Sequence, residues 1–183
     1  MLYGIDKTLG PLNRTQNLSN KIILENRGVD DSLIDDHKGK FDFITLFHVL
    51  EHVSNPDFFI SVLLNLLTEN GNLIISTPNS PMTFEKFWFD IMNHPPHHML
   101  RLNRKSYESI AKKYDLKVKF LYNSNSLISD FVSSLKLKYD GSFAESQGIL
   151  KYLFLSPFIF FRIFFNSLMS KRSNTILVVF SKK

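Results

Sequence analysis

Two apolar runs separated by an amphipathic stretch constrain the fold of this chain more than any other feature. Phe41–Phe47 (FDFITLF) and Asn72–Thr77 (NLIIST) are both typical of strands buried on both faces. Between them, Asp57–Leu67 has the length and apolar spacing of a helix, entered through Asn55-Pro56 and left through Asn70-Gly71. A strand, a helix and a second strand in this order predict a parallel βαβ unit.

The rest of the chain continues this alternation of strands and helices. Further predicted elements are strands at Leu2–Ile5, Leu116–Tyr122 and Thr175–Ser181, and a helix at Asn103–Tyr114. Towards the N-terminus we also expect a helix at Leu18–Asn26 stopped by Gly28, and a weak strand near Val29–Ile34. The pattern predicts a single α/β domain, residues 1–183.

Composition excludes several classes of protein. The 183 residues contain no cysteine, which excludes a disulfide framework, and no basic stretch followed by an apolar run marks a secretory signal. We therefore expect a cytoplasmic protein. The formal net charge is +5, but the basic residues are scattered apart from Lys171-Arg172 and Lys182-Lys183, so no nucleic-acid partner is expected.

The segment Gly39–Asn79, GKFDFITLFHVLEHVSNPDFFISVLLNLLTENGNLIISTPN, contains a strand, an H-x-L-E-H-type turn, a helix and a strand ending in Pro-Asn. It closely resembles the middle of the class I S-adenosylmethionine-dependent methyltransferases that act on small molecules, quinones and sugars. One departure is Asn70, where the first of two glycines is common. The resemblance implies a three-layer Rossmann-like sheet, mostly parallel with an antiparallel last strand. It also implies S-adenosylmethionine as cofactor and methyl transfer to a small or lipid-linked acceptor.

Other segments extend the resemblance. Asn93–Leu116 looks like the loop and helix that follow the family's fifth strand, and residues 172–183 look like its closing strand. Leu2–Asp6 (LYGID) looks like the second strand with its terminal acidic residue. The family's first strand and G-x-G-x-G loop should precede LYGID, and Met1 leaves no room for them, so we expect a domain without them. The Leu2 strand must then pair with Phe41–Phe47, stay loose, or borrow a partner.

The resemblance assigns four residues to the cofactor. Asp6, at the end of a short strand, would accept hydrogen bonds from the ribose hydroxyls; the alternative is a solvated turn aspartate. Asp31 lies where the family often places the acid that faces adenine. Phe47 and His48 would line the pocket where a strand opens, with His48 beside the sulfonium or the substrate. The alternative for His48 is a local bond at a helix start.

The spacing His48, Glu51, His52 can bring three side chains together on one helix face. The same string is the inverzincin zinc motif. A zinc hydrolase needs it within a sustained helix and needs a third ligand elsewhere, whereas here a buried strand precedes it and Pro56 follows closely. We therefore assign no metal ligand. A non-hydrolytic divalent-metal site remains the alternative to Glu51 and His52 orienting the turn.

Histidines crowd the loop between the second apolar run and the helix at Asn103–Tyr114. His98 aligns with a recurrent histidine of the family, and it is our first candidate for a base that removes a proton from the acceptor, with His97 second. Imidazoles titrate near neutral pH in general, which suits this role. The alternative is that proline-stiffened histidines hold the loop, and methyl transfer itself depends mainly on positioning.

The segment 123–171 is predicted to be an insertion or lid that carries an aromatic helix. Within it, Ile149–Met169 approaches the length of a membrane span, but Pro157 and Arg162 interrupt the apolar run. We expect it to cover the active site and to touch the inner face of the membrane, presenting a lipid-linked acceptor. The alternative is a buried helix packed on the sheet. Trp88 and its neighbouring phenylalanines would wall an acceptor pocket or belong to the core.

Two other classes of function remain open. One is a catalytically inactive remnant of the methyltransferase fold, or an interaction module. The other is a peripheral membrane protein without catalysis. Binding of S-adenosylmethionine separates the enzyme from both.

Overall fold

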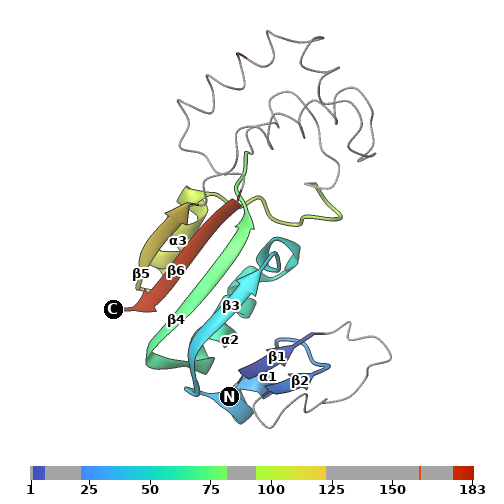
Figure 1. The fold of residues 1–183 in the computed structure, drawn as a ribbon, viewed down its shortest axis with the longest axis vertical. Helices are drawn as coiled ribbons and strands as arrows, with labels where there is room; N and C mark the ends of the chain where they lie inside the picture. The colour runs from blue at the N-terminus through green and yellow to red at the C-terminus, as the bar shows by residue number, and fades with distance from the viewer. Residues whose placement is uncertain (1, 7–21, 82–93, 123–160, 162–174) are drawn as a thin grey trace.

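The computed structural model describes residues 2–6, 22–81, 94–122, 161 and 175–183, which form two sheets with helices packed on them (Figure 1). The smaller sheet pairs β1 (Leu2–Ile5) with β2 (Ile22–Glu25). The larger sheet has the order β3-β4-β6-β5, with β3 at Phe41–Phe47, β4 at Leu67–Pro78, β5 at Leu116–Tyr122 and β6 at Thr175–Lys182. The helical segments are α1 (Asp31–His37), the 3-10 turn η1 (Leu50–His52), α2 (Pro56–Leu66) and α3 (Arg104–Lys113).

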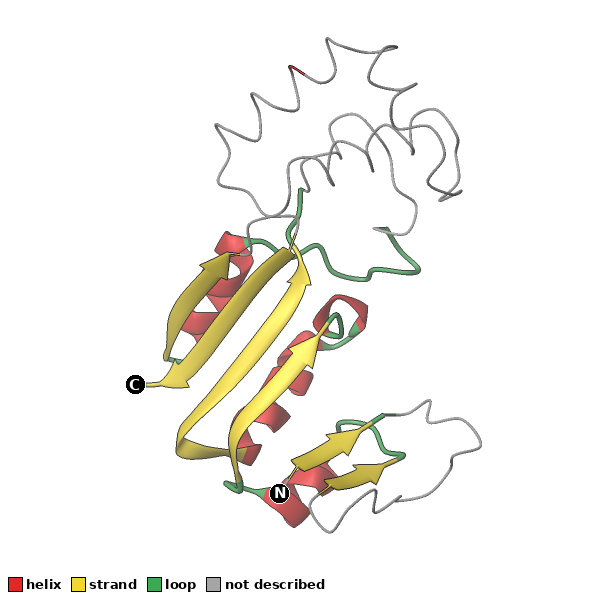
Figure 2. Cartoon of the chain, viewed as in Figure 1, coloured by secondary structure: helices red, strands yellow, loops and turns green. Residues whose placement is uncertain are grey.

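The larger sheet is mixed. β3 and β4 run parallel, as the βαβ pattern predicts, whereas β6 lies between β4 and β5 and runs antiparallel to both. Alternate residues of β6 are fully buried, as expected for a strand with one covered face. Figure 2 shows α2 and α3 on the same face of this sheet. The predicted α/β class is confirmed. The three-layer arrangement stays a prediction.

Helix α2 connects the two parallel strands and supplies much of the core. It begins where predicted, because the Asn55 side chain accepts a hydrogen bond from the Phe58 amide at 3.2 Å and Pro56 occupies the first turn. Its buried face presents Ile60, Val62, Leu63 and Leu66 to the sheet. Burial of each such side chain contributes about 1.5–3 kcal/mol.

The junction between α2 and β4 differs from the prediction. The helix ends at Leu66, and Leu67 already belongs to β4 and pairs with Phe41, so no loop at Asn70-Gly71 separates the two elements. Gly71 is required for another reason. A Cβ atom there would lie 3.0 Å from the Phe41 carbonyl oxygen and 2.9 Å from Leu67 Cδ2. The glycine therefore permits close approach of two backbones inside the sheet.

Helix α3 and strand β5 lie where the sequence predicts them. A capping box between Asn103 and Ser106 starts the helix, and its buried face carries Tyr107 and Ala111. The Tyr107 hydroxyl lies 2.7 Å from Thr77 Oγ1 of β4, which ties α3 to the centre of the sheet. The chain then turns at Asp115, whose φ is 53°, and enters β5.

The N-terminal predictions were partly wrong. The strand at Leu2–Ile5 is confirmed as β1, but Ile22–Glu25 is a strand parallel to it, not the end of a helix. The weak strand expected near Val29–Ile34 is also wrong, because α1 spans Asp31–His37. A short apolar run such as Ile22–Leu24 fits either a strand or a helix until its pairing partner is known.

The sequence alone left open which strand β1 pairs with. Among the described residues, β1 pairs with β2 and not with β3, and the two sheets are separate (Figure 2). They are held together by packing instead. The Tyr3 ring of β1 lies 4.6 Å from the His37 ring of α1 and 5.6 Å from the Phe41 ring of β3, between ring centroids.

Several predictions fall on residues outside the described ranges. These are most of the segment 123–171, the aromatic run 149–169 apart from Phe161, and Trp88 with its neighbouring phenylalanines. Within the described parts of the chain, no helix has the length and apolar character that crossing a membrane requires.

Candidate functional site

Two of the predicted site residues follow the carboxyl ends of strands that point the same way. Asp6 follows β1, and its amide donates to the Glu25 carbonyl oxygen at 3.1 Å. His48 follows β3, and its amide donates to the Ser76 carbonyl oxygen at 2.9 Å. Figure 1 shows both strand ends at the same edge of the two sheets. Ligands of open α/β sheets bind at this edge.

A cavity of about 890 Å³ lies between the two strands. Its lining includes Asp6 after β1, Val49 and His52 after β3, and Gly28 and Val29 between β2 and α1. The predicted pocket residues Phe47 and His48 are not among the lining residues. The remaining lining is mainly apolar and comes from β1, β3, α1 and α2. The cavity thus joins the carboxylate after β1 to the turn after β3.

His48 adopts an unusual backbone conformation. Its φ is 54°, in the left-handed region, which costs a residue with a side chain about 1–3 kcal/mol. Its imidazole Nδ1 donates to Glu51 Oε1 at 3.2 Å. The strained turn re-aims the chain at the end of β3, so that η1 begins immediately beside the cavity.

Glu51 is the most unusual polar residue of the site. It is only 1% exposed, and its Oε2 atom has no hydrogen-bond partner among the described residues. A buried carboxylate oxygen without a partner is costly, and in native proteins such an atom is explained by strain, by a catalytic role, or by a bound water or ion. The Glu51 carbonyl oxygen, by contrast, accepts from the amides of Met99 and Leu100 at 2.8 and 3.0 Å.

These bonds attach the histidine loop to η1. The imidazole Nδ1 of His52 donates to the His97 carbonyl oxygen at 2.6 Å, which leaves Nε2 of a neutral His52 ring as an acceptor. The rings of His52 and His98 meet edge to face with centroids 4.8 Å apart. At the other end of the loop, Arg101 Nε donates to Ser80 Oγ at 2.8 Å. The predicted base His98 is therefore held against the turn that follows β3.

The loop and the turn together form a cluster with the donor set of a metal site. One ligand atom each from Glu51, His52 and His98 lies within 4.8 Å of the others. Imidazole and carboxylate are common ligands of divalent zinc, iron and manganese. The sequence suggested a divalent-metal site only as an alternative, at the motif His48, Glu51 and His52, and it did not indicate that His98 joins Glu51 and His52.

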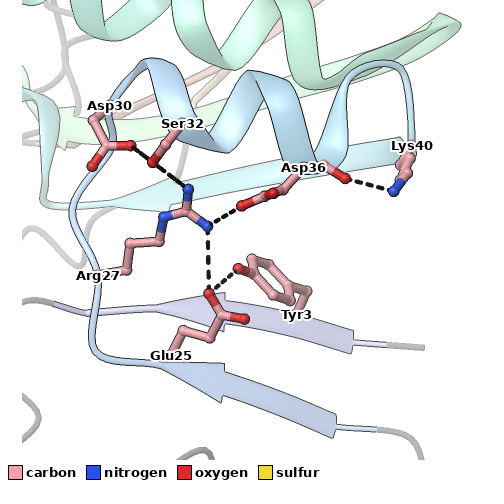
Figure 3. Close-up of polar contacts among 7 residues, drawn as sticks. All are labelled: Tyr3, Glu25, Arg27, Asp30, Ser32, Asp36 and Lys40. Atoms are coloured by element: carbon pink, nitrogen blue, oxygen red, sulfur yellow. Dashed lines mark hydrogen bonds and ion pairs between the residues drawn. The ribbon is translucent and has the colours of Figure 1, made fainter.

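The second acidic candidate lies elsewhere. Asp31 is exposed at the first turn of α1, and it is not among the residues that line the cavity. The neighbouring Asp30 belongs to a polar network around Arg27, shown in Figure 3. Arg27 pairs with Asp36 at 2.7 Å and with Glu25 at 3.7 Å. The Ser32 hydroxyl and Arg27 hold the pKa of Asp30 below its usual value.

Sequence reasoning did not identify the role of Arg27. The cation bridges the end of β2 to α1, and so holds the Gly28-Val29 backbone at the cavity wall. The signal was present in principle, since a lone arginine among Glu25, Asp30 and Asp36 is a ready ion-pair centre. These acids come together because Ile22–Glu25 forms a strand, which the sequence pattern did not predict.

Comparison with known proteins agrees with the fold. Residues 2–119 match a methyltransferase domain family, and the chain belongs to this family, the class I S-adenosylmethionine-dependent methyltransferases. Membership implies use of S-adenosylmethionine.

Two curated relatives are ubiquinone biosynthesis O-methyltransferases. The protein from Glaesserella parasuis serovar 5 (strain SH0165) is 58% identical over 40 residues, which cover 22% of this chain and 17% of the relative. The protein from Pelagibacter ubique (strain HTCC1062) is 27% identical over 127 residues, which cover 61% of this chain and 52% of the relative. The chain thus matches about half the length of the second relative and less of the first.

Solved structures support the fold alone. A SAM-dependent methyltransferase from Archaeoglobus fulgidus has a TM-score of 0.55 at 14% identity, with 98% of this chain and 75% of that chain covered. The [4+2]-cyclase SpnF has a TM-score of 0.54, also at 14% identity, with 98% and 66% covered. At identities this low, the likeness shows the fold and not the reaction, so the reaction has to be inferred from the residues of the site.

Proposed function

We propose that this chain transfers a methyl group from S-adenosylmethionine to a hydroxyl oxygen of a small or lipid-linked acceptor. The observation that carries the proposal is the placement of Asp6 and the His48 turn at one edge of two sheets, with a cavity of about 890 Å³ between them. Oxygen is the proposed acceptor atom because both curated relatives are named O-methyltransferases.

The described residues fit the adenosine half of the cofactor. Asp6 would accept hydrogen bonds from the two ribose hydroxyls, and the Gly28-Val29 backbone and the Val49 side chain would flank the base. Phe47, which is 61% exposed, and His48 would lie near the sulfonium at the mouth of the cavity, next to the lining residues Leu46 and Val49. Asp31 is the weaker of the two acidic candidates because it lies off the cavity lining. Among the described residues, no glycine-rich turn reaches the cavity to hold the methionine half.

S-adenosylmethionine, when bound, supplies an electrophilic methyl group on sulfur. The role proposed for the chain is to hold the acceptor hydroxyl and remove its proton. His98 would take this proton on its imidazole as the acceptor oxygen forms its bond to the methyl carbon, while the carbon–sulfur bond breaks and the sulfur leaves as a neutral thioether. The contacts of His97 and Met99 with His52 and Glu51 fix the loop that carries His98. His97 acts here through its backbone carbonyl, which makes it a positioning residue.

The Glu51 cluster favours a second chemistry at the same place. A divalent cation held by Glu51, His52 and His98 would bind the acceptor hydroxyl and lower its pKa, so that no separate base is required. The unpartnered Oε2 atom of Glu51 is the observation that favours this alternative.

A methyl-transfer assay tests the proposal. Tritiated S-adenosylmethionine is incubated with phenols that carry short or long apolar chains, and labelled ether is counted. His98→Ala is expected to lower turnover about 100-fold or more while cofactor binding persists. His94→Ala is the control, because the substitution keeps the His94 carbonyl oxygen that accepts from the amides of His97 and His98. Equal turnover in both variants would remove His98 from the reaction.

The lipid-linked acceptor rests on the segment 149–169, which lies outside the described residues. Its proposed contact with the membrane predicts that the chain sediments with anionic vesicles and not with neutral ones. Failure to sediment with either would leave a small soluble acceptor. An interaction module without catalysis remains the other class of function. It is favoured by β1 and β3, each of which pairs along one edge only among the described strands.

A further inference from the structure

Charge is divided unevenly between two parts of the described chain. Residues 2–6 and 22–81 carry ten acidic and three basic side chains, whereas residues 94–122 and 175–183 carry two acidic and nine basic ones. The formal net charges are therefore −7 and +7. All residues that line the cavity belong to the acidic part. Figure 1 shows β1, β2 and α1 at one end of the described structure and α3 and β5 at the other, so the charges are separated in space as well as in sequence.

The basic part exposes cations that no carboxylate neutralises. Three of its cations form ion pairs, namely Arg104 with Glu108 at 2.8 Å, Lys113 with Asp57 at 2.7 Å, and Lys183 with Asp115. Four others are exposed and form no ion pair with another described residue, namely Lys105, Lys112, Lys117 and Lys119. We call these four lysines, together with Leu121, the basic edge.

Strand β5 holds the centre of the basic edge. It is an edge strand of the larger sheet, and its Lys117 and Lys119 pair with Ser181 and Val179 of β6. Side chains of paired residues lie on the same face of a sheet. Phe180, between those two partners, is buried on the face that α3 covers, so both lysines lie on the opposite face. Leu121 follows them on the same face and is 40% exposed.

Helix α3 adds positive charge on the other side of the same strand. Lys105 and Lys112 are seven residues apart, which places them on one side of the helix, and both are exposed. The helix packs on the sheet through Tyr107 and Ala111 instead. The edge of the sheet at β5 is therefore basic on both of its sides.

The type of cation indicates the kind of partner. All four unpaired cations are lysines, which act as point charges on flexible stems and suit mobile lipid head groups. Recognition of phosphates fixed in a nucleic acid favours the planar fork of arginine, and Arg104 is engaged with Glu108. Leu121 supplies an exposed apolar side chain next to the lysines, and an interfacial surface combines these two properties.

We propose that the basic edge docks the chain on an anionic lipid bilayer, with α3 and β5 against the head groups. Because the acidic part is repelled by the same surface, the cavity lies on the side that faces the solution. This surface is separate from the segment 149–169. Docking requires neither cofactor nor turnover, so the inference stands or falls separately from methyl transfer.

Sedimentation with vesicles tests the proposal on the whole 183-residue chain. Vesicles of phosphatidylcholine are compared with vesicles that also contain phosphatidylglycerol, in low and in high salt. We expect binding only to the anionic vesicles, and its loss in high salt, because salt screens exposed charges. The double variant Lys117→Gln, Lys119→Gln should weaken this binding about twentyfold, since each lysine near an anionic surface contributes about fivefold.

The matched control removes the same charge from the acidic part. Lys38→Gln with Lys40→Gln replaces two exposed lysines after α1 and should leave vesicle binding unchanged. Thermal melts that match the wild type show that both variants are folded. Equal binding by the two double variants would overturn the proposal and leave the segment 149–169 as the membrane contact. Displacement of the vesicles by a DNA duplex at equal phosphate concentration would overturn it in favour of a nucleic acid.

A single fluorescent label tests the orientation. The chain contains no cysteine, so Leu121→Cys and Asp35→Cys each provide one site for an environment-sensitive dye. On anionic vesicles we expect a blue shift from the dye at position 121, beside the lysines of β5, and none from the dye at position 35 on α1. A shift only at position 35 would reverse the proposed orientation and contradict the proposal.

Discussion

The imidazole Nδ1 of His52 lies 2.6 Å from the carbonyl oxygen of His97, although the two residues are 45 positions apart in the sequence. This bond, with those from Met99 and Leu100 to the Glu51 carbonyl oxygen, makes the turn after β3 and the loop after β4 a single unit. The position of His98 therefore depends on the H-x-x-E-H turn. Its motif residues act as a scaffold as well as a source of reactive groups.

Replacement of Glu51 by glutamine is expected to stabilise the protein in cation-free buffer. The buried carboxylate has an unpartnered oxygen among the described residues, and a neutral amide removes most of that desolvation cost while its oxygen still accepts from His48. We expect a gain of about 1–3 kcal/mol in the free energy of unfolding, measured by urea denaturation. A loss of similar size would show that the carboxylate has a partner that stabilises it.

The same variant tests the metal alternative. If Glu51, His52 and His98 hold a divalent cation, manganese or zinc at about 100 times its Kd stabilises the wild-type chain by about 2.7 kcal/mol. Glu51→Gln should reduce this response, and thermal melts with each ion and with chelator record it. An equal response in both proteins would place the ion elsewhere.

The buried pair of Tyr107 and Thr77 is expected to matter for stability. Tyr107→Phe removes one partner of a 2.7 Å hydrogen bond at a residue with no exposed surface, and leaves the Thr77 hydroxyl without it. The expected cost is about 1–2 kcal/mol in the free energy of unfolding. Tyr114→Phe is the control, because the Tyr114 hydroxyl bonds the Asp57 carbonyl oxygen at the surface, and it should change stability by less than about 0.5 kcal/mol. Equal effects would mean that burial does not set the cost.

Tyr3 predicts a loss of stability at high pH. Burial, with the hydrogen bond to Glu25 next in importance, raises the pKa of Tyr3 from 10.0 to about 12. Below pH 10 the phenol is protonated in both states; between 10 and 12 the unfolded chain ionises first, so the free energy of unfolding falls.

Tyr3→Phe should therefore lose less stability over that interval than the wild type does, in denaturation curves taken at several pH values. Tyr107, whose pKa burial also raises, still contributes in the variant, so the loss is reduced and not abolished. Parallel pH profiles for the two proteins would contradict the assignment to Tyr3.

Local pattern was sufficient where an apolar run or a helix cap marks an element by itself. Phe41–Phe47, Leu116–Tyr122 and the start of α2 follow from apolar runs and caps. Ile22–Glu25 was misassigned because only its pairing with Leu2–Ile5 makes it a strand.

The candidate site, like the fold, was predicted from the sequence only in part. Asp6, His48 and His98 could be selected from sequence, because each lies next to a predicted strand or in the histidine loop. The burial of Glu51, the contact of His52 with His98, and the distance of Asp31 from the cavity lining are results of tertiary packing. No periodicity in one sequence contains that information.

The fold alone does not determine the reaction. The Archaeoglobus fulgidus methyltransferase and the cyclase SpnF match this chain at nearly the same TM-scores, 0.55 and 0.54. Methyl transfer is therefore argued from Asp6, the His48 turn and the histidine loop, in combination with family membership.

Calorimetric titration of the 183-residue chain with S-adenosylmethionine tests the central claim most directly. We expect saturable binding that Asp6→Asn weakens about tenfold, since a charged hydrogen bond to the ribose is lost, while Asp35→Asn, on the exposed side of α1, leaves it unchanged. Absence of binding, or equal binding by the Asp6 variant, would contradict a cofactor cleft framed by Asp6 and the turn after β3.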